Sequence, residues 1–110
     1  MRWSRNPTQA PRGTESKLQA ACEAQLGKLW TMRQIVDWYH RPDRKPGRGE
    51  RSGLPDLLIA VRPGLVLAVE LKTETGKVTP KQAAWLACWG DRGAVCRSVG
   101  ELLDFVGRWV

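Results

Sequence analysis

Two apolar runs separated by a short turn stand at the centre of the chain. Residues 57–61 and 65–69 are aliphatic throughout, and Arg62-Pro63-Gly64 lies between them. Runs of this length joined by a tight turn predict two antiparallel strands in a hairpin. Acidic side chains occur only at the open end, where Asp56 precedes the first strand and Glu70, followed by Lys72, ends the second.

A helical pattern precedes the hairpin. Thr14 is a good N-cap residue, and a helix over residues 15–29 follows from it. Its expected buried stripe is Leu18, Ala21, Cys22, Leu26 and Leu29. At about 100° per residue, Glu15 lies within roughly 20° of the centre of this stripe, whereas Glu23 lies about 100° away from it. We therefore expect Glu15 to point inward and Glu23 to face solvent. Residues 33–40 have strand propensity and predict the first strand of the sheet.

Two further helices and one strand follow the hairpin. Thr79-Pro80-Lys81-Gln82 combines a cap residue, a proline at the first helical position and a capping-box glutamine. Residues 94–99 predict a short strand, and Ser98 with Glu101 resembles a second capping box that opens the last helix. The apolar side chains expected to pack on these helices are Trp85, Leu86, Cys88, Trp89, Leu102, Leu103, Phe105, Val106, Trp109 and Val110. The order α-β-β-β-α-β-α predicts an α/β fold with a mixed sheet flanked by helices.

Composition limits the chain to one core. At 110 residues we expect a single domain over 14–110, preceded by a basic arm over 1–13. No apolar run approaches the ~18 residues of a membrane span, and the N-terminus lacks the apolar segment of a signal peptide. Three cysteines without C-x-x-C spacing, all within apolar patterns, are typical of reduced core thiols, in preference to a zinc site with His40. We expect a cytoplasmic protein without membrane contact.

The charge balance favours a polyanionic partner. The chain has 18 Lys and Arg against 11 Asp and Glu, a formal net charge of +7. Cations concentrate between residues 41 and 52, a segment with two prolines and two glycines that leads into the hairpin. The expected phosphate-binding residues are Arg41, Arg44, Lys45, Arg48, Arg51 and His40. The alternative for residues 41–52 is a linker that is only solvated, and the alternative for His40 is a structural role.

The hairpin brings the ionisable side chains together. The start of its first strand lies beside the end of its second, so Asp56, Glu70 and Lys72 converge. Two carboxylates at one point of an apolar sheet are costly unless a cation accompanies them. The alternative for the three residues is a structural salt bridge of Lys72, and the alternative for Glu15 is an interaction with the helix dipole.

The motif resembles that of a nuclease superfamily. Pro55-Asp56, followed by Glu70-Leu71-Lys72 on a paired strand, resembles the PD-(D/E)xK nucleases. The fuller pattern adds an inward Glu15, the Gly-x-Pro-Asp sequence from Gly53 to Asp56, and Gln82 early in the next helix. In this form, over residues 14 to about 106, the chain is similar to the VRR-NUC (virus-type replication-repair nuclease) branch. The resemblance implies a restriction-endonuclease-like core, and a minimal stand-alone member of the kind found in phages and bacteria.

Phosphodiester hydrolysis assigns a role to each of these positions. We expect Asp56, Glu70, the backbone carbonyl of Leu71 and Glu15 to bind Mg²⁺ or Mn²⁺. Lys72 would orient the attacking water and hold the phosphate, because neighbouring carboxylates favour its charged form. Gln82 would either contact Lys72 or the water, or serve only as a capping residue.

The sequence thus predicts a divalent-metal-dependent DNA endonuclease. The resemblance implies branched or four-way junction DNA as substrate, and a homodimer. Trp3, Trp30, Trp38 and Trp109 lie outside the expected core stripes or at chain ends and are candidates for its interface; the alternative is that the tryptophans fill the core. No other small-molecule cofactor is expected. The alternatives are a non-catalytic nucleic-acid-binding or repair- or packaging-complex subunit, and a nuclease acting on RNA, because no residue pattern distinguishes ribose from deoxyribose.

Overall fold

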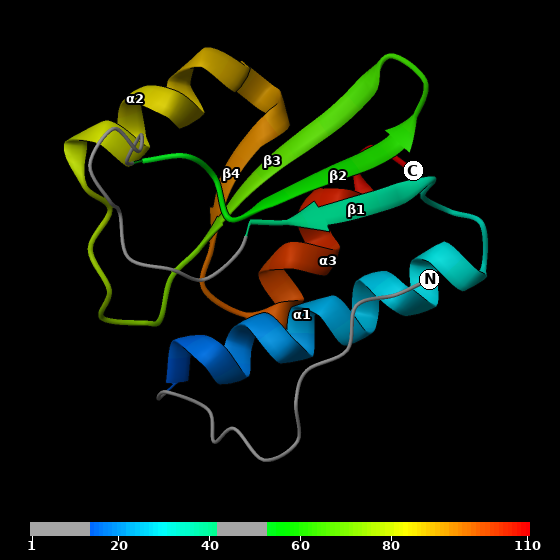
Figure 1. Cartoon of the computed structure of the whole chain (residues 1–110), viewed down its shortest axis with the longest axis horizontal. Helices are drawn as coiled ribbons and strands as arrows, with labels where there is room; N and C mark the ends of the chain where they lie inside the picture. The colour runs from blue at the N-terminus through cyan, green and yellow to red at the C-terminus, as the bar shows by residue number, and fades with distance from the viewer. Residues whose placement is uncertain (1–13, 42–52) are drawn as a thin grey trace.

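The computed structural model describes residues 14–41 and 53–110, which build three α-helices around one mixed sheet (Figure 1). In chain order the elements are α1 (Thr14–Thr31), β1 (Asp37–His40), β2 (Leu57–Arg62), β3 (Leu65–Leu71), α2 (Pro80–Trp89), the 3-10 helix η1 (Gly90–Arg92), β4 (Gly93–Cys96) and α3 (Val99–Gly107). This order confirms the predicted α/β arrangement. The predicted basic arm, residues 1–13, lies outside the described residues.

The sheet has the strand order β1-β2-β3-β4. β1 pairs antiparallel with β2, and β2 pairs antiparallel with β3 as the hairpin pattern predicts, while β3 and β4 run parallel. Leu57 pairs with Val69, so the start of β2 lies beside the end of β3. β3 is enclosed by a strand on each side, and its last five residues are buried. The most enclosed strand therefore carries Glu70.

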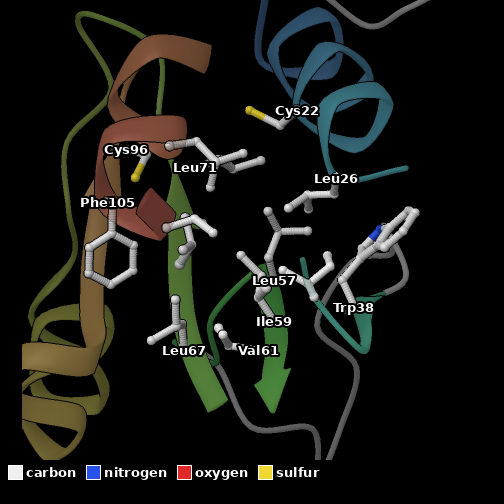
Figure 2. Close-up of a cluster of buried hydrophobic side chains, with 14 residues drawn as sticks. Cys22, Leu26, Trp38, Leu57, Ile59, Val61, Leu67, Leu71, Cys96 and Phe105 are labelled. Carbon is white, nitrogen blue, oxygen red and sulfur yellow. The ribbon is translucent and has the colours of Figure 1, made fainter. Parts of the chain in front are cut away.

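The hydrophobic core lies between the sheet and the pair α1 and α3 (Figure 2). Alternation along β2 and β3 directs one set of side chains into this core, and α1 and α3 supply the opposite wall. Among the fully buried members are Cys22, Leu26, Leu57, Ile59, Leu67, Val69, Leu71 and Leu102. α2 packs against β3 and β4 without burying any residue of its own. Within the described ranges, no helix is long and apolar enough to cross a membrane.

Some side chains expected in the core lie elsewhere. Ala21 and Cys88 are exposed, because the stripes that their helices bury are narrower than the apolar pattern suggests. Val110 is also exposed, beyond the end of α3. All three cysteines are free thiols. Burial raises the pKa of Cys22 to about 11 and that of Cys96 to about 12, so these two thiols stay protonated at neutral pH.

The candidate interface tryptophans do not share one environment. Trp38 is a core residue with 6% of its surface exposed, so an interface role for it is wrong. Trp109 is partly buried and packs against the core, whereas Trp30 is 44% exposed. Trp3 lies outside the described residues.

The segment before β2 is held closely against the start of α2. Gly53 has φ +88°, a left-handed conformation that disfavours side chains. A Cβ placed on Gly53 would lie 2.8 Å from the backbone carbon of Lys81 and 2.9 Å from its carbonyl oxygen. Glycine is thus required here for two reasons, and it lets the segment that leads to Asp56 approach α2.

We expect Gly53→Ala to lower the free energy of unfolding by about 2–4 kcal/mol, because backbone strain and a clash with rigid backbone atoms add. Gly64→Ala is the matched control. Gly64 also has a positive φ, +82°, but no atom lies within 4 Å of a Cβ placed there. Denaturant unfolding of both variants measures the difference, and an equal loss in the two would contradict the close approach to Lys81.

Candidate active site

The central hairpin places Asp56 against the end of β3. Asp56 is the residue just before β2, and its Oδ2 accepts a hydrogen bond from the Leu71 backbone N–H at 2.8 Å. The last paired residues of the two strands are Leu57 and Val69. The hydrogen bond from Leu71 to the Asp56 carboxylate therefore extends the contact between the two chain segments past the last backbone pair. It holds the Asp56 carboxylate beside Glu70, the residue that precedes Leu71.

Glu70 is a buried carboxyl group on the face of β3 that points away from the α1–α3 core. Only 2% of it is exposed. Its Oε2 accepts a hydrogen bond from the Gln82 side-chain Nε2 at 2.9 Å, and Lys72 Nζ lies 3.7 Å from the same oxygen. Its Oε1 is buried and has no hydrogen-bond partner in the part of the chain that the structure describes. One carboxylate oxygen is thus paired and the other is available.

The environment of Glu70 favours its protonated form. Burial and the charge of Asp56 raise the pKa of Glu70 to about 8. The positive charges of Lys72 and Arg41 oppose this rise but do not cancel it. A shift of this size, produced by burial together with a second carboxylate, is typical of functional sites.

Gln82 joins this carboxylate to the start of α2. Its Oε1 accepts from the Thr79 backbone N–H at 2.9 Å, and its own backbone N–H donates to Thr79 Oγ1 at 3.1 Å. The predicted capping box is therefore confirmed. The expectation that capping and a contact in the site exclude one another is wrong, because the two ends of the amide serve different partners. The partner in the site is Glu70, and not Lys72.

Gln82→Ala removes both functions, whereas Thr79→Ala removes only the cap. We expect each variant to lower the free energy of unfolding by about 1 kcal/mol. Only Gln82→Ala should also reduce the cleavage activity that the sequence predicts, because it alone leaves Glu70 Oε2 without its amide donor. Thermal unfolding and single-turnover cleavage of both variants test this separation. Equal cleavage by the two would restrict Gln82 to capping.

Arg41 lies beside Asp56 on the adjacent strand edge. Its backbone N–H donates to the Asp56 carbonyl at 2.9 Å, and its Nη2 lies 3.6 Å from Asp56 Oδ1. About a third of the side chain is exposed. The predicted phosphate-binding residue therefore belongs to the carboxylate site itself. Four further members of that group, Arg44, Lys45, Arg48 and Arg51, lie outside the described residues.

A family comparison agrees with this geometry. The model of the VRR-NUC domain matches residues 1–99. The chain belongs to the VRR-NUC domain family. A solved structure described as a VRR_NUC domain has the same fold, with a TM-score of 0.59 and 22% sequence identity over 87% of this chain and 97% of that one. No curated protein matches the chain.

Glu15 does not lie where the helical pattern predicts. In the VRR-NUC fold of this chain it is exposed in the first turn of α1. The fully buried part of α1 begins at Cys22, two turns later, so the stripe cannot be extrapolated back to Glu15. No group of three or more His, Cys, Asp and Glu side chains is arranged to hold a metal within residues 14–41 and 53–110. The expectation of an inward Glu15 is wrong.

Glu23 was expected to face solvent, and this expectation is also wrong. It is partly buried, and its Oε1 accepts from the Trp38 indole Nε1 at 3.3 Å. Gln19 Nε2 donates to its Oε2 at 3.4 Å. Glu23 thus joins α1 to β1. A buried indole that needs an acceptor was the available signal, although the sequence does not show which carboxylate supplies it.

His40 lies away from the two carboxylates. It pairs with Leu57 in the sheet, so its side chain shares the face covered by α1, and its Nδ1 lies 3.4 Å from Gln19 Nε2. Glu70 occupies the opposite face, because side chains alternate along β3. This position favours the structural alternative for His40 over the expected contact with phosphate.

The donor set fits a hard divalent cation. Mg²⁺ prefers oxygen ligands and is commonly held by one or two carboxylates, with water completing its shell. Asp56 and Glu70 supply adjacent carboxylates, and the unpartnered Oε1 of Glu70 is the free ligand that such an ion needs. A cation would also offset the repulsion that keeps Glu70 protonated. The pair, without a third carboxylate, is therefore a suitable site.

Proposed function

We propose that this VRR-NUC protein is a Mg²⁺- or Mn²⁺-dependent endonuclease that hydrolyses phosphodiester bonds of DNA, with branched or four-way junction DNA as the favoured substrate. The observation that carries the proposal is the buried Glu70 carboxyl group, one oxygen of which has no partner among the described residues and lies beside Asp56. A carboxyl group that served only a salt bridge with Lys72 would not need a second carboxylate against it. Membership of a nuclease-type family supports the same reading.

Asp56, Glu70 and the Leu71 carbonyl would hold the cation. When bound, the cation polarises the scissile phosphate and stabilises the leaving alkoxide. The Leu71 N–H and the Gln82 amide orient the two carboxylates, since each donates to one carboxylate oxygen. These two contacts leave Glu70 Oε1 free toward the cation.

Lys72 acts beside the carboxylates as a fixed positive charge. Its Nζ is 3.7 Å from Glu70, which is too long for a direct hydrogen bond, so the ammonium keeps its donors for other partners. It would hold a non-bridging phosphate oxygen and orient the attacking water toward phosphorus. Water adds to phosphorus and releases a proton to solvent, the bond to the leaving oxygen breaks, and that oxygen takes up a proton from solvent. Lys72 thereby stabilises the negative charge that develops on the phosphate oxygens during attack.

The basic composition supports DNA as the partner. A formal net charge of +7 attracts the phosphate backbone regardless of sequence, and Arg41 would place one of these cations beside the scissile phosphate. The proposal includes a homodimer, because cutting two strands of a junction requires two active sites. Exposed Trp30 is the remaining described candidate for that contact.

A cleavage assay tests the function directly. Labelled four-way junction, flap, nicked duplex, plain duplex and single-stranded DNA, with a matching RNA hairpin, are each incubated with Mg²⁺, Mn²⁺ or EDTA. We expect cutting with either metal, none in EDTA, and the highest rate on the junction. Asp56→Asn should abolish the cutting, whereas Asp91→Asn, at an exposed position in η1, should not change it.

The same assay separates the alternatives. Faster cutting of RNA would replace DNA as the substrate. Salt-dependent DNA binding without cutting by the wild type would favour a non-catalytic nucleic-acid-binding subunit. Equal cutting in EDTA would remove the metal from the proposal.

A further inference from the structure

A single arginine holds the turn that follows the catalytic strand. Arg97 comes directly after β4, and its Nη1 donates to the backbone carbonyls of Thr73 and Gly76, both at 2.7 Å. The Glu74 carbonyl lies 3.4 Å from the same nitrogen. Three carbonyl oxygens thus converge on one guanidinium group, which is partly buried. We call Arg97 with residues 73–76 the turn clamp.

The turn clamp lies against the side chain of Lys72. The Gly76 N–H donates to the Thr73 carbonyl at 3.2 Å and to Thr73 Oγ1 at 3.1 Å, which closes the turn. A Cβ placed on Gly76 would lie 3.4 Å from Lys72 Cδ. The backbone at Gly76 is therefore one wall of the space that the Lys72 methylene groups occupy. The Lys72 backbone N–H donates to the Cys96 carbonyl at 3.1 Å. Lys72 directly follows β3 and Arg97 directly follows β4, so the backbones of the two residues lie side by side.

We propose that Arg97 is a positioning residue for Lys72. The inference rests on the proposed function and adds to it a residue outside the Pro-Asp and Glu-x-Lys motif. Lysine has four rotatable side-chain bonds, and fixing its ammonium group at the phosphate requires that some of this freedom be removed in advance. The turn clamp removes it by packing beside the side chain. The carbonyl oxygens of Thr73 and Gly76 repel one another, and the guanidinium charge keeps them together.

Arg97 is anchored from the other side as well. Its backbone N–H donates to Glu101 Oε1 at 2.6 Å, and the Glu101 N–H donates to Ser98 Oγ at 3.1 Å. The first turn of α3 therefore fixes the base of Arg97. This differs from the capping box predicted for Ser98 and Glu101. In a capping box Glu101 would accept from the backbone N–H of Ser98, whereas here it accepts from that of Arg97. Both N–H groups of Arg97 Nη1 are directed at carbonyl oxygens, which distinguishes this arginine from one that is free to bind phosphate.

The test compares Arg97→Gln and Arg97→Lys with the control Arg92→Gln. Arg92 is an exposed arginine in η1, so its loss removes one surface charge and leaves the turn clamp intact. We expect Arg97→Gln to lower the single-turnover cleavage rate roughly 10–100-fold with DNA affinity unchanged, because misplacement affects chemistry and not binding. Arg97→Lys should recover part of the rate. NMR of the protein without DNA should show faster exchange of the Gly76 amide and a more mobile Lys72 side chain in Arg97→Gln.

Each other outcome overturns the inference. An unchanged cleavage rate would do so, and so would weaker DNA binding with a smaller salt dependence at unchanged rate, which would make Arg97 a phosphate contact. An unchanged Gly76 exchange rate and Lys72 mobility would also overturn it. If the wild type does not cut, the proposed function fails, and the NMR comparison alone still decides whether Arg97 orders Lys72.

Discussion

Lys72→Ala is expected to reduce the metal-dependent cleavage rate by roughly 10²–10⁴-fold while the protein stays folded. The substitution removes the positive charge that would stand beside the scissile phosphate. The side chain lies at the end of β3 with 14% of its surface exposed, so its loss leaves no large cavity in the α1–α3 core. Single-turnover cleavage of the best substrate, measured at saturating protein, isolates the chemical step.

Lys77→Ala is the matched control for this prediction. Lys77 is exposed in the segment between the turn clamp and α2, so the variant loses the same charge outside the site. Its cleavage rate should stay within about twofold of the wild type. Comparable losses in the two variants would mean that the charge acts only through general attraction of DNA, and Lys72 would then have no catalytic role.

Glu70→Gln is expected to abolish cleavage and, in the same molecule, to stabilise the fold near pH 8. The glutamine would keep an acceptor for Gln82 and gain an N–H donor toward Asp56, where the wild type places two carboxyl groups. The variant should be more stable than the wild type in EDTA by roughly 1–3 kcal/mol at pH 8. Glu70 would thus be required for the proposed cleavage although it lowers the stability of the fold near pH 8.

The pH dependence follows from the direction of the pKa shift. The pKa of Glu70 is raised from 4.5 to about 8 on folding, so between these values the folded state retains a proton that the unfolded state has released. Its contribution to stability is fully present below about pH 4.5 and is lost as the pH rises toward 8. Glutamine does not titrate. The advantage of the variant over the wild type should therefore be small at pH 5 and largest at pH 8.

Denaturant unfolding at pH 5 and pH 8 in EDTA, with Glu74→Gln as an exposed control, measures this difference. The control should show no such growth with pH. Addition of Mn²⁺ at pH 8 should raise the stability of the wild type and leave that of Glu70→Gln nearly unchanged, since a cation stabilises the form that binds it. A variant that is less stable than the wild type at pH 8 would contradict the raised pKa.

The central part of the fold could be predicted because its signals are local. Aliphatic runs around Pro63-Gly64 specify the hairpin, and Thr79-Pro80 specifies the start of α2. The proximity of Asp56 and Glu70 follows from the hairpin alone, because the turn sets the first strand's start beside the second strand's end. The order of the sheet and the parallel pairing of β4 agree with a mixed sheet but depend on contacts distant in sequence.

The errors occurred where one helix face had to be extrapolated. Glu15 and Glu23 differ in environment because β1 supplies Trp38 beside Glu23, while no residue in the described ranges 14–41 and 53–110 covers the first turn in this way. Helical periodicity gives directions around an axis, but it does not give the place where the neighbouring layer ends. Arg97 was missed for a related reason. Its carbonyl partners are backbone groups, which leave no trace in the identity of residues 73–76.

The double role of Gln82 links the Glu70 carboxylate to the local stability of α2. This helix buries none of its residues, so its first turn can open while the rest of the described structure stays folded. When its first turn frays, the amide that holds Glu70 Oε2 leaves with the capping box. Solvent can then reach Glu70 without global unfolding. The only free energy required is that of the local opening, which is smaller. Exchange of protons and ions at Glu70 would thus be governed by the opening and closing of one helical turn.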